Sequence, residues 1–69
     1  MKSRTKKILN ELKAIQNNAR RPINSRKAVR VVARKTQAPA PAVWGVLSGL
    51  SRRADITWVK RIPGHSYFR

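Results

Sequence analysis

Cysteine is absent from the 69 residues of the chain, which also contain only two acidic residues and one histidine. The absence of cysteine excludes disulfide bonds and zinc sites built from thiolates. One histidine and two carboxylates provide neither a metal cage nor the pair of groups that acid–base catalysis requires. We therefore expect a protein that is not an enzyme, that has no catalytic or metal-binding residues, and that needs neither a cofactor nor a small-molecule substrate.

Long apolar segments are also missing from the sequence. A membrane-spanning helix needs roughly 20 predominantly apolar residues, and the basic stretch from Lys2 to Lys7 is not followed by the apolar region of a secretory signal peptide. Residues 1–35 are rich in arginine and poor in acids, which also suits an organelle import sequence. The sequence predicts a cytoplasmic protein, associated with the nucleoid in a bacterial or phage host, with organelle import as the alternative.

Positive charge is what the sequence has in excess. Seventeen Lys and Arg residues give a net charge of +15. Such a chain repels itself, and a polyanion relieves that repulsion. The hydrophobic content of 41% is nevertheless higher than a disordered basic tail would have. These features predict one small folded domain with a cationic surface, and nucleic acid as its partner. An anionic membrane is a less favoured partner.

Three segments show the spacing of helices. Residues 1–7 form a basic lead-in, and the first helix is predicted over residues 8–19. The second is predicted over residues 26–35 with Ser25 as its N-cap, since arginines recur there at every fourth position, although its valines would also suit a strand. The third is predicted over residues 39–53, with prolines in its first turn. The apolar residues expected to pack together in the core are Ile8, Leu12, Ile15, Val31, Val32, Val43, Val46, Leu47 and Leu50.

The third helix contains two glycines, Gly45 and Gly49. Each glycine weakens a helix by about 1 kcal/mol relative to alanine. Two explanations remain open: a close approach of the helix to DNA, or close packing inside the fold.

The C-terminal part of the sequence has the pattern of a β-hairpin. Residues 56–61 are rich in β-branched and aromatic side chains, Pro63 and Gly64 signal a turn, and residues 66–69 form a second short strand. The side chains of Trp58, Val59, Tyr67 and Phe68 are expected to form core and cross-strand contacts rather than platforms for stacked bases. Residues 22–25 are interpreted as a plain connection.

Residues 25–69, SRKAVRVVARKTQAPAPAVWGVLSGLSRRADITWVKRIPGHSYFR, resemble a winged helix-turn-helix domain. In this resemblance they supply the second helix, the turn, the recognition helix and the wing, and residues 8–19 supply the first helix. The expected fold is therefore α+β, a three-helix winged helix-turn-helix with a C-terminal two-stranded hairpin wing, over residues 1–69. The sequence departs from the usual pattern because prolines replace the common Ser or Thr cap of the recognition helix.

The resemblance implies a protein that binds double-stranded DNA as a transcriptional regulator, a replication or partition factor, or an accessory protein of a phage or mobile element. The second helix would contact phosphates, the third would enter the major groove and the wing would lie on the flanking groove. The DNA-binding residues expected on this basis are Arg26, Lys27, Arg30, Arg34, Gln37, Trp44, Ser48, Arg52, Arg53, Lys60, Arg61, His65 and Arg69. Trp44 could instead lie at the edge of the core or contact a second protomer.

Two other functions remain as alternatives. Ribosomal and other structural RNA-binding proteins are also small, basic and free of cysteine, so RNA is the alternative partner. The amphipathic segment 3–19 would also suit a membrane-active basic peptide, although the hairpin and the second apolar stripe have no role in such a peptide. Because one protomer would cover only half of a site, a homodimer or cooperative assembly on DNA is a further expectation.

Overall fold

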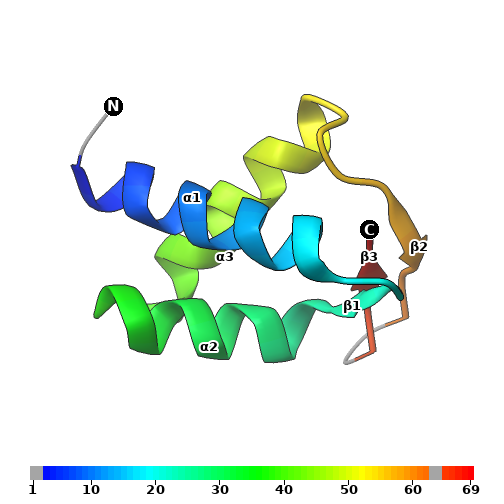
Figure 1. Cartoon of the computed structure of the whole chain (residues 1–69), viewed down its shortest axis with the longest axis horizontal. Helices are drawn as coiled ribbons and strands as arrows, with labels where there is room; N and C mark the ends of the chain where they lie inside the picture. The colour runs from blue at the N-terminus through cyan, green and yellow to red at the C-terminus, as the bar shows by residue number, and fades with distance from the viewer. Residues whose placement is uncertain (1–2, 63–64) are drawn as a thin grey trace.

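The computed structural model describes residues 3–62 and 65–69. These residues form three helices, namely α1 (Ser3–Asn18), α2 (Ser25–Thr36) and α3 (Ala40–Arg52), and three short strands, namely β1 (Ile23–Asn24), β2 (Trp58–Lys60) and β3 (Tyr67–Phe68). The helices pack against one another, with α1 in front of α3 and above α2, and the sheet lies at one end of this bundle (Figure 1). The α+β class, with three helices followed by a strand pair, is confirmed.

The sheet has one strand more than the predicted hairpin. Within the described residues its order is β1-β3-β2, and both pairings are antiparallel. Phe68 lies opposite Ile23 on one side and opposite Trp58 on the other. The interpretation of residues 22–25 as a plain connection was therefore wrong, because a two-residue strand is too short to show the alternation that identifies strands in a sequence. The predicted turn at Pro63 and Gly64 lies outside the described residues.

Helix α1 begins earlier than the sequence predicted. It starts at Ser3, so the described part of the basic lead-in is helical, and it ends at Asn18. Lysine and arginine are good helix formers, and nothing in their chemistry stops a helix that continues into a buried apolar stripe. That stripe is led by Ile8 and Leu12, each 1% exposed. The helix was predicted to include Ala19, but Ala19 lies beyond its end and is exposed.

Helix α2 forms as predicted, but its cap and its buried face differ. The side-chain oxygen of Asn24 accepts the N–H of Lys27 at 3.1 Å, so Asn24 is the N-cap and Ser25 is buried in the first turn. Val29 is buried, whereas Val31 is 40% exposed. The expected inward position of Val31 was therefore wrong.

Lys35 explains part of this rotation of α2. Its Nζ lies 3.6 Å from Glu11 Oε2 on α1, and its side chain is 63% exposed. Because Val31 and Lys35 are one helical turn apart, they share a side of α2. Turning this side outward keeps the ammonium group of Lys35 in water and avoids the free-energy cost of burying its charge.

The turn between α2 and α3 reverses the chain in a few residues. Gln37 adopts the left-handed conformation with φ 54°, and the N–H of Ala38 donates to the carbonyl of Ala33 at 3.1 Å. Pro39 precedes α3 and Pro41 lies in its first turn, as the sequence predicted. A proline there loses no helical hydrogen bond, because the first N–H groups of a helix have no intrahelical acceptor.

The core lies where the three helices meet and extends to the sheet. Val43 and Leu47 of α3 are fully buried, together with Val32 of α2. Phe68 of β3 is also fully buried and closes the core at the sheet end, with Ile56 beside it in the same cluster. The predicted core is thus confirmed for α1 and α3, with Ile15 and Val46 packed at its edge. No helix within the described residues combines the length and the apolarity needed to cross a bilayer.

Candidate nucleic-acid interface

Helix α3 presents an open face of small residues to solvent. Pro41, Gly45, Ser48 and Arg52 are all exposed, on the side of the helix opposite the buried Leu47. A Cβ atom placed on Gly45 or Gly49 would meet no described atom within 4 Å apart from its chain neighbours and the adjoining backbone of its own helix. Close packing inside the fold therefore does not explain the two glycines, and the backbone of α3 is open to approach from outside.

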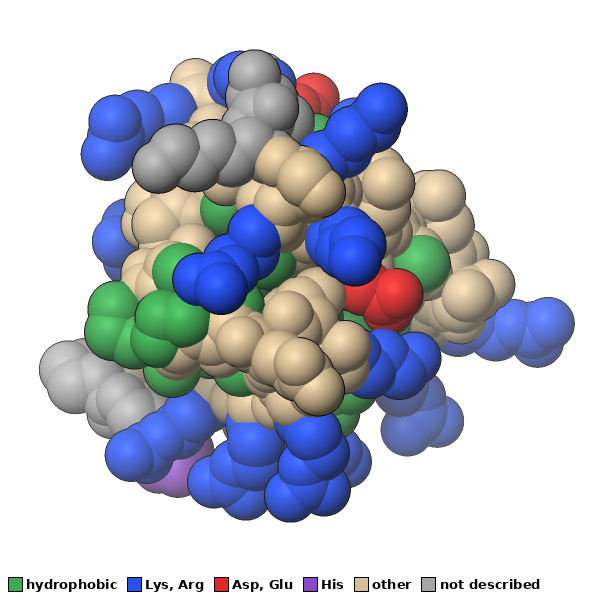
Figure 2. Space-filling view, turned by 90° about the vertical axis from the view of Figure 1, so that its left-hand side faces the viewer, with side chains coloured by type: hydrophobic (Ala, Val, Ile, Leu, Met, Phe, Trp, Pro, Cys, Tyr) green, Lys and Arg blue, Asp and Glu red, His purple; other side chains and the backbone are tan. Residues whose placement is uncertain are grey.

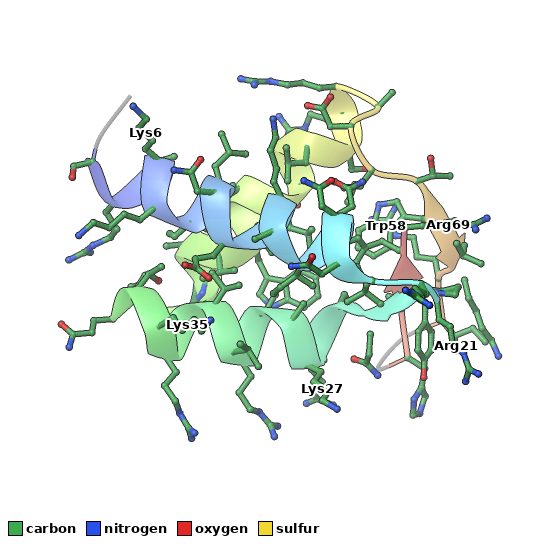
Figure 3. All side chains as sticks on the ribbon, viewed as in Figure 1. Lys6, Arg21, Lys27, Lys35, Trp58 and Arg69 are labelled. Carbon is green, nitrogen blue, oxygen red and sulfur yellow. The ribbon has the colours of Figure 1, made fainter. Side chains whose placement is uncertain are left out.

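Helix α2 carries a row of cations. Arg26, Lys27, Arg30 and Arg34 are exposed, and Lys27 points away from the bundle in Figure 3. In Figure 2, Lys and Arg side chains gather along the lower edge of the molecule, which α2 forms. These side chains can reach a polyanion placed below α2 without any change in the fold.

A hollow of about 250 Å³ lies between α3 and β2, and two cations line it. Arg52 comes from α3 and Arg61 follows β2, while Ser48, Ser51 and Trp58 complete the wall. Two guanidinium groups and two hydroxyl groups thus face one space, and all four can donate hydrogen bonds to an anion. The hollow brings together the predicted recognition helix and the predicted wing.

Trp58 holds the two sides of this hollow together. Its indole N–H donates a hydrogen bond to Ser51 Oγ at 2.9 Å. The guanidinium carbon of Arg61 lies 5.2 Å from the centroid of the same ring, within the range of a cation–π contact. Phe68 packs against Trp58 edge to face, with the ring centroids 5.9 Å apart. The position of Arg61 is therefore set by a ring that is fixed both to α3 and to the core.

A second hollow, of about 260 Å³, joins α2, α3 and the residue before β3. Its lining consists of Ser25, Arg26, Trp44 and Ser66. Trp44 is 36% exposed, so it does not belong to the core and its indole is open to a partner beside Arg26. The backbone N–H of Ser25 donates to the carbonyl of Ser66 at 2.9 Å, which fixes the start of α2 next to β3.

The other residues predicted to bind DNA lie apart from these two hollows. Gln37 is exposed in the turn between α2 and α3, and Lys60 and His65 are exposed in and after the strand β2. Arg53 lines a different hollow, between α3 and α1, together with Thr5, Leu9 and the two glycines Gly45 and Gly49. Arg69 lies beside Arg20 and Arg21 at the end of α1. The structure thus places Arg26 and Trp44 in one hollow, Ser48, Arg52 and Arg61 in the other, and Arg53 and Arg69 elsewhere.

Sequence reasoning assigned no role to Ser51 and expected Trp58 to make core and cross-strand contacts, which its pairing with Phe68 and its packing against the core confirm. Trp58 is in fact half-buried, and it supplies the hydrogen bond and the stacking surface that position Arg61. The signal in the sequence was weak: Ser51 follows Ser48 by three residues and so lies on the same flank of the helix. Val59 was expected in cross-strand packing, but it is 49% exposed, so that expectation was wrong.

The cations of this surface have almost no acidic partners. Within residues 3–62 and 65–69 the structure contains one ion pair, between Lys35 and Glu11, and neither residue lines either of the two hollows. The same residues contain no cluster of three or more His, Asp and Glu side chains that could hold a metal ion. The unbalanced charge is thus available to an anion. Comparisons of the chain with protein-family models, curated proteins and solved structures found no match.

Proposed function

We propose that the protein binds double-stranded DNA as a winged helix-turn-helix domain and performs no chemistry on it. In this proposal α3 enters the major groove, the cations of α2 contact the phosphates, and β2 with β3 forms the wing. The observation that carries the proposal is the hollow in which Arg52 of α3 and Arg61 next to β2 face the same space. One continuous surface thereby joins the helix that would read the groove to the strand pair that would flank it.

The shape of α3 supports entry into the groove. The major groove is about 12 Å wide and admits an α-helix. The exposed face of α3 has small residues at Gly45 and Ser48, and the space around both glycines is open. Bulky side chains would hold the helix axis away from the bases, whereas these residues allow its backbone to approach them. Ser48 and Arg52 then reach base edges, since a hydroxyl can serve any base and arginine favours guanine.

The charge of α2 supports phosphate contacts. Arg26, Arg30 and Arg34 recur at every fourth position and are exposed along one side of the helix. Contacts from such side chains to phosphate oxygens fix the orientation of a protein on the duplex but carry no sequence information. They release condensed counterions, so affinity falls steeply as salt rises.

The order of the elements supports the winged assignment. A short turn links α2 to α3, and a strand pair follows α3 directly. The additional strand β1 fits this arrangement because it pairs with β3 and leads straight into α2. The start of α2 and the wing are therefore held in one sheet, which keeps Arg26 and the wing at a fixed separation. A homodimer or cooperative assembly on DNA follows from the proposal, since one domain covers a half-site.

Competition between duplex DNA and structured RNA tests this proposal. The protein is titrated into a labelled duplex at several salt concentrations, with an unlabelled RNA hairpin or an unlabelled duplex as competitor. We expect the duplex to compete better, and the logarithm of affinity to fall by about 0.9 for each phosphate contact per tenfold rise in salt. A protein that prefers the RNA hairpin would contradict the proposal and would favour a structural RNA-binding role. Binding to neither nucleic acid would also contradict it.

A further inference from the structure

Many cations of the chain lie outside the proposed DNA interface. We name the α1 surface after the helix that carries most of it. Its members are exposed cations of α1 and of the segment that follows it: Arg4, Lys6, Lys7, Lys13, Arg20 and Arg21. In Figure 3 Lys6 projects upward from α1, whereas Lys27 of the proposed interface projects downward from α2. Lys6 and Lys27 therefore point in different directions, whereas Arg21 lies at the sheet end of the molecule.

The α1 surface receives little compensation from the protein itself. The chain has only two acidic residues, Glu11 and Asp55. Glu11 already pairs with Lys35, in the one ion pair that the described residues form. These cations therefore need an external anion to relieve their mutual repulsion.

One bound duplex does not supply that anion. The domain measures 30 × 21 × 21 Å. The Debye length at physiological ionic strength is about 8 Å, so exposed charges more than this distance apart are largely screened from each other. A duplex held by α2 and α3 thus supplies little counter-charge to the cations of α1 that point away from α2, such as Lys6.

The buried side of α1 decides which kind of polyanion fits. Ile8 and Leu12 are each 1% exposed and belong to the core of the domain. A helix that binds a lipid bilayer places its apolar side among the acyl chains. Helix α1 has no such side to offer while the domain is folded. What it exposes is a set of long cationic side chains, which suits the phosphates of a nucleic acid in water.

We propose that the α1 surface binds a second DNA duplex, so that one molecule bridges two DNA segments. This inference rests on the proposed function for the first duplex. The second contact is made by flexible lysine and arginine side chains with phosphates, and it therefore has no sequence preference. The protein would then bring together distant DNA segments in addition to occupying a site.

A bridging assay with two matched charge-removal variants tests the inference. A biotinylated duplex is immobilised on beads, protein is added, and recovery of a second, fluorescent duplex is measured. The first variant carries Lys6→Gln, Lys7→Gln and Lys13→Gln on α1. The second carries Arg26→Gln, Arg30→Gln and Arg34→Gln on α2. Each variant loses three charges, and glutamine favours helices about as well as lysine and arginine do. Both variants must therefore show the same helical circular dichroism spectrum as the parent.

We expect the two variants to separate binding from bridging. With dilute labelled duplex, the α1 variant should bind within about threefold of the parent, because its lost charges belong to α1, outside the proposed interface on α2 and α3. Its recovery of the second duplex should fall at least about tenfold, since three phosphate contacts are lost. The α2 variant should lose at least about tenfold in affinity for the single duplex.

Stoichiometry gives an independent readout. A duplex of roughly 12 base pairs is about 40 Å long, at 3.4 Å per step, and so spans one face of the domain. In sedimentation with excess duplex, the parent should carry two duplexes per protein and the α1 variant one. A parent that binds one duplex and does not bridge would overturn the inference and leave the proposed function standing, whereas a parent that binds no duplex would overturn both.

Two further outcomes would also overturn the inference. An α1 variant that bridges as well as the parent would assign bridging to self-association, which sedimentation of the DNA-free protein would reveal. The other outcome concerns anionic phosphatidylserine vesicles. The α1 surface would be assigned to membranes if these vesicles compete with the second duplex, bind more tightly than DNA, and no longer bind the α1 variant.

Discussion

The indole N–H of Trp58 donates a hydrogen bond to Ser51 Oγ at 2.9 Å, which ties β2 to the C-terminal half of α3. Arg61 lies over the same indole ring and lines a hollow with Arg52. The separation of the two arginines is therefore set by a contact between side chains seven residues apart in the chain. A wing that hung freely from α3 would carry no such constraint.

A double-mutant cycle on this pair tests its contribution. Trp58→Phe keeps an aromatic ring against Phe68 but removes the donor, and Ser51→Ala removes the acceptor. Each single change should lower the free energy of unfolding, and the two effects should not add, with a coupling energy of about 0.5–1.5 kcal/mol. Urea denaturation of the parent and the three variants measures it. Strictly additive losses would show that the bond does not hold the wing to α3.

The core makes a second prediction, for Leu47. Its side chain is fully buried, so Leu47→Ala should lower the free energy of unfolding by about 2–5 kcal/mol. Because this rivals the stability of a small domain, Leu47→Met serves as a milder change, with an expected cost under about 1.5 kcal/mol. Val31→Ala is the exposed control and should cost about 0.5 kcal/mol or less. Thermal unfolding in which Val31→Ala is more destabilising than Leu47→Ala would contradict the observed core.

The helices could be predicted because each has an apolar stripe that recurs at helical spacing. The rotation of α2 could not be decided in the same way. Val29, Val31 and Val32 fall within four positions, so more than one rotation buries two valines. The choice depends on partners distant in the sequence, among them Glu11, which draws Lys35 and with it Val31 to the surface. Strand β1 could not be predicted either, because two residues have no periodicity and the partner of Ile23 lies 45 residues away at Phe68.

The candidate site was predictable where charge alone determines position. The arginines of α2 recur at every fourth residue, and their charge keeps them exposed. Arg52 and Arg53 show the limit of this reasoning. They are adjacent in the sequence and were predicted together, but Arg52 lines the hollow with β2 whereas Arg53 lines the hollow with α1. One step along a helix turns a side chain by about 100°, so neighbours reach different surfaces.

A third prediction separates phosphate contacts from base contacts. Arg30→Ala should weaken binding to all duplexes alike and should flatten the salt dependence by about one unit, the value of one lost phosphate contact. Arg52→Ala should instead change the relative affinity among duplexes by about 1–3 kcal/mol, the range for a lost base contact. Binding isotherms on a selected duplex and on random duplexes distinguish the two effects. If Arg52→Ala lowers the affinity for all duplexes equally, α3 contacts the DNA backbone and does not read bases through Arg52.

The last prediction concerns the two glycines of α3. Gly45→Ala and Gly49→Ala each add a methyl group that meets no described atom within 4 Å apart from its chain neighbours and the adjoining helix backbone, so the folded domain accommodates both without strain. Because glycine is about 1 kcal/mol less favourable than alanine in a helix, each change should raise the free energy of unfolding by about that amount. The same methyl groups would meet the DNA if α3 lies deep in the major groove. We therefore expect both variants to be more stable than the parent and to bind duplex DNA more weakly, by about tenfold or 1.4 kcal/mol, within the range of a lost base contact.

Urea denaturation and binding isotherms on the same preparations check this opposition of stability and affinity. Ala14→Gly is the matched control, since Ala14 is exposed in the middle of α1 and outside the proposed interface. It should lower the free energy of unfolding by about 1 kcal/mol and leave the affinity for a dilute duplex unchanged, which separates stability from binding. Glycine variants that gain stability and bind DNA as tightly as the parent would show that the backbone of α3 stays outside the groove. The contacts would then have to come from the long side chains of Arg52 and Arg61 and from the cations of α2.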